Sequence, residues 1–187
     1  MSTALATSEP VRQVDRPPGT AGDQQQFLSF LLGDEEYGVD ILRVQEIKGW
    51  DSKGWDLVTP IPNSSEYILG VINLRGIVVP IIDLGRRFGK KPVGHTKTTV
   101  VIVVKVQGGK AERTIGFVVD AVIDVYTVNA DQLHPPPDLG PDETRFLKGL
   151  VTVDRKMVVL LWVDQLGNAV LSSPRPNVNQ PMSGECS

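Results

Sequence analysis

The side chains that could act as a nucleophile or a base are few and far apart in the sequence. The two histidines are His95, in a polar stretch, and His134, beside three prolines, while the single cysteine, Cys186, stands next to the C-terminus. A hydrolase needs a nucleophile within hydrogen-bond reach of a base, and a zinc site gathers several His or Cys ligands. The sequence therefore predicts neither kind of site, and we expect no bound cofactor or metal.

Carboxylates offer two further candidates for chemistry. The densest acidic cluster, Asp34-Glu35-Glu36, lies between two expected strands, and we interpret it as a solvated turn and not as a cation site. Asp120 and Asp124 fall on consecutive strands and could form a general acid–base pair. We keep that pair as a remote alternative and predict that the chain is not an enzyme.

Composition favours a protein partner. The 187 residues carry a formal net charge of −3, with a pI near 5.4, and basic residues cluster only at Arg86-Arg87 and Lys90-Lys91. A nucleic-acid binder would need a larger basic surface, so an oligonucleotide-binding small barrel is a remote alternative. The longest apolar region, residues 67–84, is interrupted by Asn, Arg, Gly and Pro, so we expect no membrane insertion.

Short apolar runs separated by Gly, Pro, Asn and Asp predict an all-β fold. The expected strands are Phe27–Leu32, Glu36–Val39, Val44–Lys48, Ile68–Asn73, Ile77–Asp83, Thr99–Val106, Thr114–Val119, Ala121–Val128, Phe146–Val153 and Lys156–Leu161. They form two clusters of about five strands each, which suggests two small barrels, because closure removes exposed strand edges.

The order of these clusters suggests a division of the chain. We predict a disordered leader over 1–25, a first subdomain over about 26–88 and a polar linker over 89–97. A second subdomain over about 98–162 and a closing helix over about 163–167 would follow, with a disordered tail over 168–187. Few other helices are expected, among them a short one over residues 84–88.

One expected hairpin places a cation at its tip. Its two strands join at Leu74-Arg75-Gly76, and Gly76 is expected to adopt a positive φ. Pro80 lacks an amide donor, which predicts an edge strand or a bulge. Arg75 could be an ordinary solvated turn residue, an intramolecular partner of a carboxylate such as Asp83, or a contact for another protein.

Several segments, in this order and spacing, resemble one known family. They are Phe27–Leu32, the run from Gly33 to Lys48, Gly70-Val-Ile-Asn-Leu-Arg-Gly-Ile-Val-Val-Pro-Ile-Ile-Asp-Leu and Gly116-Phe-Val-Val-Asp. From about Phe27 to Gly167 the chain resembles the CheW family of bacterial chemotaxis coupling proteins.

The resemblance implies two SH3-like β-barrel subdomains packed around a shared apolar seam. It also implies a non-catalytic cytoplasmic adaptor, recruited to chemoreceptor arrays, that couples the cytoplasmic tip of the receptors to the regulatory domain of the CheA histidine kinase. Other copies of the family would join it in rings. A CheW-like scaffold serving a different output, such as pili-based motility, is the alternative.

The same resemblance assigns residues to two separate surfaces. The kinase-binding set is Val44, Glu46, Ile47 and Gly70, with Leu139 as a loop contact. The receptor-binding set is Arg75 and Gly76, with Val100, Gly116, Val122 and Val125 lining a groove between the subdomains. Each valine could equally be a core residue, because alternate strand positions face inward.

Residues 49–56 depart from the family pattern. This segment is longer than in many relatives and brings Trp50 and Trp55 close to the proposed kinase surface. The tryptophans could pack onto the barrel, which we favour, or enlarge the interface, where tryptophan is common among hot spots.

Overall fold

The computed structural model describes residues 24–50, 57–91, 94, 96–108, 111–137, 140 and 144–172. Trp55, His95, Leu139, Cys186 and nearly all of both predicted tails lie outside these residues. The described part shows two corrections at the ends of the domain. Gln24 and Gln25 already belong to a strand, and the closing helix continues to Ser172.

The described part of the chain contains ten strands. They are β1 (Gln24–Leu32), β2 (Glu35–Asp40), β3 (Val44–Gly49), β4 (Ile68–Leu74), β5 (Ile77–Asp83), β6 (Val100–Gly108), β7 (Ala111–Val119), β8 (Ala121–Asn129), β9 (Leu147–Val153) and β10 (Lys156–Leu161). Each corresponds to an expected strand, with ends that differ by at most three residues. The all-β prediction is confirmed.

The helices are short. They are η1 (Ile41–Arg43), α1 (Leu84–Arg87), η3 (Ala130–Gln132) and α3 (Val163–Ser172). None of the helices among the described residues is long and apolar enough to cross a membrane.

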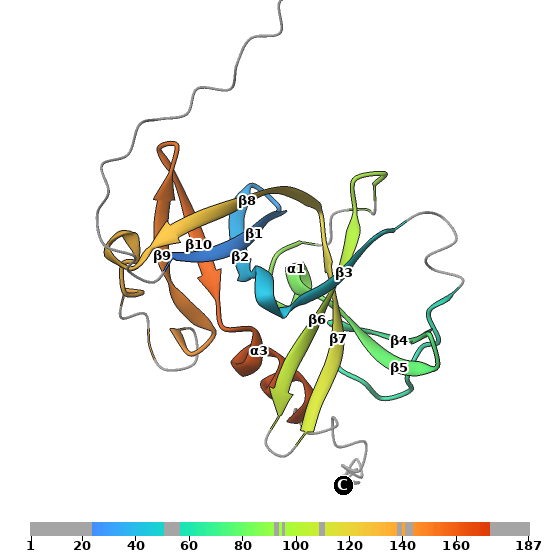
Figure 1. Ribbon diagram of the computed structural model, residues 1–187. Coiled ribbons are helices and arrows are strands. Elements are labelled where there is room, and N and C mark those ends of the chain that lie inside the picture. Colours follow the sequence, from blue (N-terminus) through green and yellow to red (C-terminus); the bar gives the residue numbers. More distant parts are fainter. Residues whose placement is uncertain are drawn as a thin grey trace, which may run out of the picture.

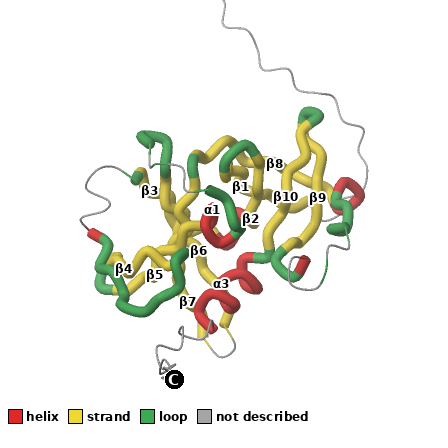
Figure 2. Tube along the Cα trace, turned by 180° about the vertical axis from the view of Figure 1, so that it is seen from behind, coloured by secondary structure: helices red, strands yellow, loops and turns green. Residues whose placement is uncertain are grey.

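The strands form two five-stranded sheets, which lie side by side in Figure 1. Sheet I has the order β8-β1-β2-β10-β9, and sheet II has the order β3-β6-β7-β5-β4. Neighbouring strands are antiparallel except for the pairs β2–β10 and β5–β7. Helices α1 and α3 lie at the junction of the two sheets, as the view from behind shows (Figure 2).

The predicted boundary at residues 89–97 does not separate the two sheets. That segment joins β5 to β6, and both belong to sheet II. The chain crosses from sheet I to sheet II through η1 and returns at Asp120, so sheet II is built from one continuous stretch, β3 to β7. Each crossing spans only a few residues, so no change of composition marks it in the sequence. The polar segment, which such a change does mark, connects two strands of the same sheet.

Alternate residues of the strands face two different cores. In β6, Ile102, Val104 and Val106 lie in a core shared by both sheets, while Val101 and Val103 lie in a core of sheet II alone. In β1, Leu28 and Phe30 belong to the shared core and Phe27 to a core of sheet I. Burial on both faces explains why these strands are almost continuously apolar.

The shared core contains residues of both sheets and of α3, which confirms an apolar seam between two subdomains. Its buried members are Leu28, Phe30, Leu32, Tyr37, Val39, Ile82, Leu84, Ile102, Val104, Val106, Ile115, Phe117, Val119, Phe146, Leu161, Val163, Leu166 and Val170. We call this set the shared core. At about 25 cal/mol per Å² of buried apolar surface, a core of this kind is the main force that holds the sheets together.

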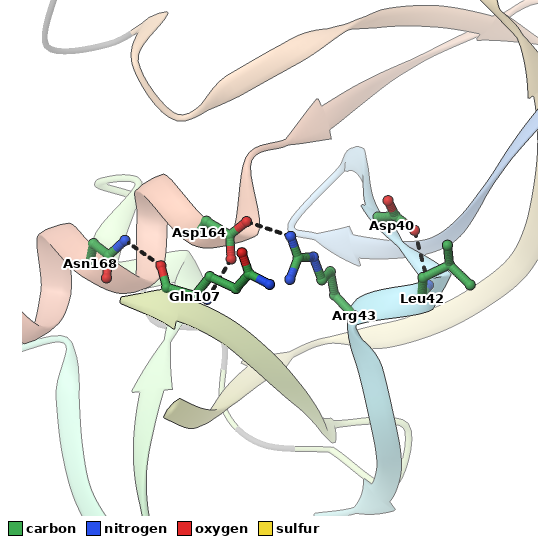
Figure 3. Close-up of polar contacts among 6 residues, drawn as sticks. All are labelled: Asp40, Leu42, Arg43, Gln107, Asp164 and Asn168. Atoms are coloured by element: carbon green, nitrogen blue, oxygen red, sulfur yellow. Dashed lines mark hydrogen bonds and ion pairs between the residues drawn. The ribbon is translucent and has the colours of Figure 1, made fainter. Parts of the chain in front are cut away.

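A polar cluster at the edge of the shared core joins α3 to η1 and to β6 of sheet II (Figure 3). The Asp164 carboxylate accepts hydrogen bonds from the Arg43 guanidinium, at 2.7 Å, and from the Gln107 backbone N–H, also at 2.7 Å. The Asn168 side chain donates to the Gln107 carbonyl oxygen at 2.9 Å. These four residues form what we call the polar clasp.

The polar clasp acts at the crossing between the sheets. Arg43 ends η1, whose first amides are capped by the Asp40 carboxylate through a 2.9 Å bond from the Leu42 N–H (Figure 3). Gly167 allows α3 to approach β6, because an added Cβ would lie 2.6 Å from Val106 Cγ2. The clasp therefore fixes α3 against sheet II while the helix continues from sheet I.

Replacing Asp164 by alanine should lower the free energy of unfolding by about 1–3 kcal/mol, because the Gln107 N–H and the Arg43 guanidinium both lose their acceptor. Urea denaturation of the purified protein measures this change. Asp131→Ala, at a carboxylate exposed in η3, is the matched control and should stay within about 0.5 kcal/mol of the parent protein. Equal stability of the Asp164 variant and the control would contradict a stabilising role of the clasp.

Candidate functional site

The candidate site begins at the tip of the β4–β5 hairpin. Arg75 and Gly76 form its two-residue turn with φ values of +52° and +86°, and the Asn73 side chain accepts the Gly76 N–H at 2.8 Å. Positive φ at both central positions is typical of a type I′ turn. The expected positive φ of Gly76 is confirmed, and the Arg75 side chain is 78% exposed.

β5 lies between β7 and β4 in sheet II, so it is not an edge strand over its whole length. However, β7 pairs with β5 only at Ile81, Ile82 and Asp83, so Pro80 and the residues before it pair with β4 alone, in agreement with the expected edge position of Pro80. Its first two residues, Ile77 and Val78, are 58% and 66% exposed. The hairpin tip thus combines a cation with exposed apolar side chains.

The Arg75 guanidinium forms an ion pair with Glu46 of β3. Arg75 Nη2 lies 3.2 Å from Glu46 Oε2, and Lys48 Nζ lies 3.5 Å from Glu46 Oε1. The interpretation of Arg75 as the intramolecular partner of a carboxylate is confirmed, but the partner is Glu46 and not Asp83, because the Asp83 carboxylate caps α1 and pairs with Arg86 at 3.2 Å. The residues assigned to two separate surfaces, Glu46 and Arg75, are therefore in contact.

A pocket of about 200 Å³ lies beside this ion pair. It is lined by Gln45, Glu46, Leu74, Arg75, Ile77, Val79 and Thr114. The lining combines an apolar floor with one cation and one carboxylate, and no metal-ligating or nucleophilic set is present among these residues. Such a surface can bind a side chain of a partner protein but has no group for covalent chemistry.

The other residues of the predicted kinase set are placed as follows. Val44 is partly buried against the shared core, and Ile47 is 43% exposed beside Glu46 on β3. Strand β3 is an edge of sheet II, paired only with β6, so its outer side is open to a partner. Gly70 is buried, and an added Cβ would collide with the Thr59 carbonyl oxygen. Leu139 lies outside the described residues.

The residues of the predicted receptor groove do not all line one surface. Val100 and Val122 are partly buried against the shared core, and Val125 is 41% exposed on β8, an edge of sheet I. Gly116 is buried inside sheet II, where an added Cβ would lie 2.5 Å from Ile81 Cδ1 and 2.9 Å from Val101 Cγ1. The structure therefore gives Gly116 a packing role within sheet II.

The candidate carboxylates are engaged in structural contacts. Asp120 accepts the Gly33 N–H at 2.6 Å, and Asp124 accepts the Val125 N–H at 2.7 Å.

The acidic cluster of residues 34–36 is also held by contacts within the fold. Hydrogen bonds from Lys90 and from the Tyr37 hydroxyl lower the pKa of Glu35. The interpretation of the acidic cluster as a solvated turn is wrong for its last member, because Glu36 is only 6% exposed.

The described residues include no group of three or more His, Cys, Asp or Glu side chains that could hold a metal ion.

Trp50 is 5% exposed and belongs to the core of sheet II, with its backbone N–H bonded to the Thr99 carbonyl oxygen at 2.8 Å. For Trp50 the packing interpretation is confirmed.

Comparison with known proteins agrees with this arrangement. A family model described as CheW-like domain matches residues 26–170. The chain belongs to the CheW family. It is 43% identical over 143 residues to the chemotaxis protein CheW of Klebsiella aerogenes, an alignment that covers 76% of this chain and 81% of that protein. To the probable chemotaxis protein CheW of Rhizobium etli it is 40% identical over 146 residues, or 78% and 88% of the two chains.

A solved structure supports the same conclusion. The chain superposes on the scaffolding protein TtCheW of Thermoanaerobacter tengcongensis with a TM-score of 0.67 and 32% identity, over 84% of this chain and 93% of that one. Membership of the family confirms the prediction of a chemotaxis adaptor that is not an enzyme, because CheW proteins are scaffolds. The family extends to proteins of other names, since protein FrzA of Myxococcus xanthus is 30% identical over 131 residues, 70% of this chain and 76% of FrzA.

Gly116→Ala should lower the free energy of unfolding by about 1–3 kcal/mol, because the new methyl group overlaps Ile81 and Val101. Gly49→Ala is the matched strand control, since nothing lies within 4 Å of a Cβ built at Gly49. Thermal or urea unfolding of both variants measures the difference. If the two variants are equally stable, Gly116 is not a packing position.

Proposed function

We propose that this chain is an adaptor that couples the cytoplasmic tip of chemoreceptors to the regulatory domain of a CheA-type histidine kinase. It would do so in the cytoplasm, at membrane-associated receptor arrays, where other copies of the family join it in rings. The observation that carries the proposal is the Glu46–Arg75 ion pair, which links a residue assigned to the kinase with one assigned to the receptor.

The mechanism of such an adaptor is binding. Ile47 and Glu46 on the open edge of sheet II offer an apolar side chain beside a charge, a combination suited to a small specific interface. Val125 on the open edge of sheet I would contact an amphipathic helix of the receptor tip. Because one rigid molecule carries both surfaces, a change at the receptor can shift the kinase between its active and inactive populations.

The first test is a calorimetric titration of the purified protein with the regulatory domain of the CheA-type kinase from its own source. We expect saturable binding that Glu46→Lys weakens at least about tenfold, since a reversed charge at the centre of a small interface costs more than about 1.4 kcal/mol. Lys105→Glu reverses a charge on β6 as the control and should bind like the parent protein. A folded parent protein that does not bind the kinase would contradict the proposal.

Arg75→Glu should weaken binding to a receptor-tip fragment about tenfold or more, while the free energy of unfolding changes by less than about 1 kcal/mol, because the Arg75 side chain is largely exposed. The double variant Arg75→Glu, Glu46→Arg restores the ion pair with its charges exchanged. It should regain the small loss of stability without regaining receptor binding. Receptor binding that returns with the exchanged pair would show that Arg75 acts through Glu46 and not by direct contact.

A further inference from the structure

Strand β8 contains one residue more than the part of β1 that it pairs with. Val125 of β8 lies opposite Leu28 of β1. Val122 lies opposite Phe30. Only Ser29 separates the two β1 residues, whereas two residues separate the two valines. This is the geometry of a β-bulge, in which the extra residue bends the strand and changes the direction of the side chains that follow.

The bulge decides which way the two valines face. In a regular strand, residues three positions apart point to opposite sides of the sheet. Here Val122 lies opposite Phe30 and Val125 lies opposite Leu28, and both of these β1 residues belong to the shared core. Residues directly opposite in an antiparallel pair share a face, so the extra residue places both valines on the same face. Without the bulge, one of them would point into sheet I.

Side chains satisfy the backbone amides that the bulge removes from the ladder. Ser29 is fully buried, and its hydroxyl oxygen accepts the Asp124 N–H at 3.3 Å. The Asp124 carboxylate accepts the Val125 N–H at 2.7 Å. An amide without an acceptor is costly where water cannot replace the bond, so the bond to the buried Ser29 hydroxyl stabilises the irregular backbone more than the exposed Asp124–Val125 bond.

The Ser29 hydroxyl lies in a polar surrounding within sheet I. Burial of the Tyr126 hydroxyl, with the Glu36 carboxylate of β2 nearby, raises the pKa of Tyr126. Glu36 is 6% exposed, and its Oε1 atom has no hydrogen-bond partner among the described residues. Buried polar groups are costly unless they are hydrogen-bonded, so the Asp124 N–H is the partner that stabilises the buried Ser29 hydroxyl.

We propose that Ser29 is a positioning residue, which fixes the bulge of β8 and so sets the valine face that receives the helical receptor tip. This inference rests on the proposed function. It adds a residue that does not touch the partner but determines where Val122 and Val125 point.

Ser29→Ala tests the inference, because it removes the buried hydroxyl with little change in volume. Calorimetric titration with a receptor-tip fragment and with the kinase regulatory domain gives both affinities. We expect the affinity for the receptor tip to fall about fivefold to tenfold. The affinity for the kinase should stay within about twofold of the parent value, because Glu46 and Ile47 lie on sheet II.

Two measurements separate positioning from a general loss of stability. Amide hydrogen exchange should accelerate at Asp124 and Val125 in Ser29→Ala before it changes in β6 or β7. Thr127→Val removes a hydroxyl on β8 that is bonded to Gln26 at 3.4 Å and lies outside the bulge, and should leave both affinities unchanged.

The outcomes distinguish this inference from the proposed function. A parent protein that binds the kinase and the receptor tip, with Ser29→Ala binding both equally well, overturns the positioning role and leaves the adaptor function standing. An equal loss of both affinities in Ser29→Ala overturns it too, because a shared loss reports stability alone. A folded parent protein that does not bind the receptor tip overturns both.

Discussion

One face of each sheet is buried against the other sheet, and the relation between the two proposed partner surfaces depends on this shared core. Because the strands are apolar on both faces, neither sheet could leave its second face in water without exposing a large hydrophobic surface. The sheets must therefore pack together, with α3 closing the junction and the polar clasp fixing the helix to β6. Two of the four edge strands, β3 and β8, carry residues of the two proposed partner surfaces.

The strands could be predicted from the sequence because their pattern is local. Each apolar run is bounded by turn residues, and strand length follows from that spacing. The division into subdomains could not, because it depends on which strands pair across long distances. The crossings at residues 41–43 and at Asp120 have no unusual composition, while the polar segment 89–97 merely connects β5 to β6.

The site was predictable only in part, and for a physical reason. The positive φ of Gly76 follows from turn chemistry, whereas the proposed partner contacts of Glu46 and Arg75 are what resemblance to the CheW family implies. Their mutual ion pair depends on the approach of β3 to the β4–β5 hairpin, which no sequence spacing reveals. Burial of Gly70, Gly116 and Glu36 is likewise a property of the packed sheets. If substitution of either glycine weakens binding, disturbed packing explains the loss without any direct contact between the glycine and a partner.

An adaptor without chemistry can transmit a change only through differences in binding free energy between two states of its partners. This requires that its two surfaces keep a fixed relation, since a flexible joint between them would absorb the change. The sheets meet that requirement through the shared core, and the hairpin tip meets it through the ion pair that connects β3 with Arg75. The second surface meets the same requirement through the bulge of β8, because the buried Ser29 hydroxyl fixes a strand that has only one neighbour in its sheet. A polar group in the interior of sheet I thus keeps an exposed edge rigid, where packing alone would leave the backbone free to slip in register.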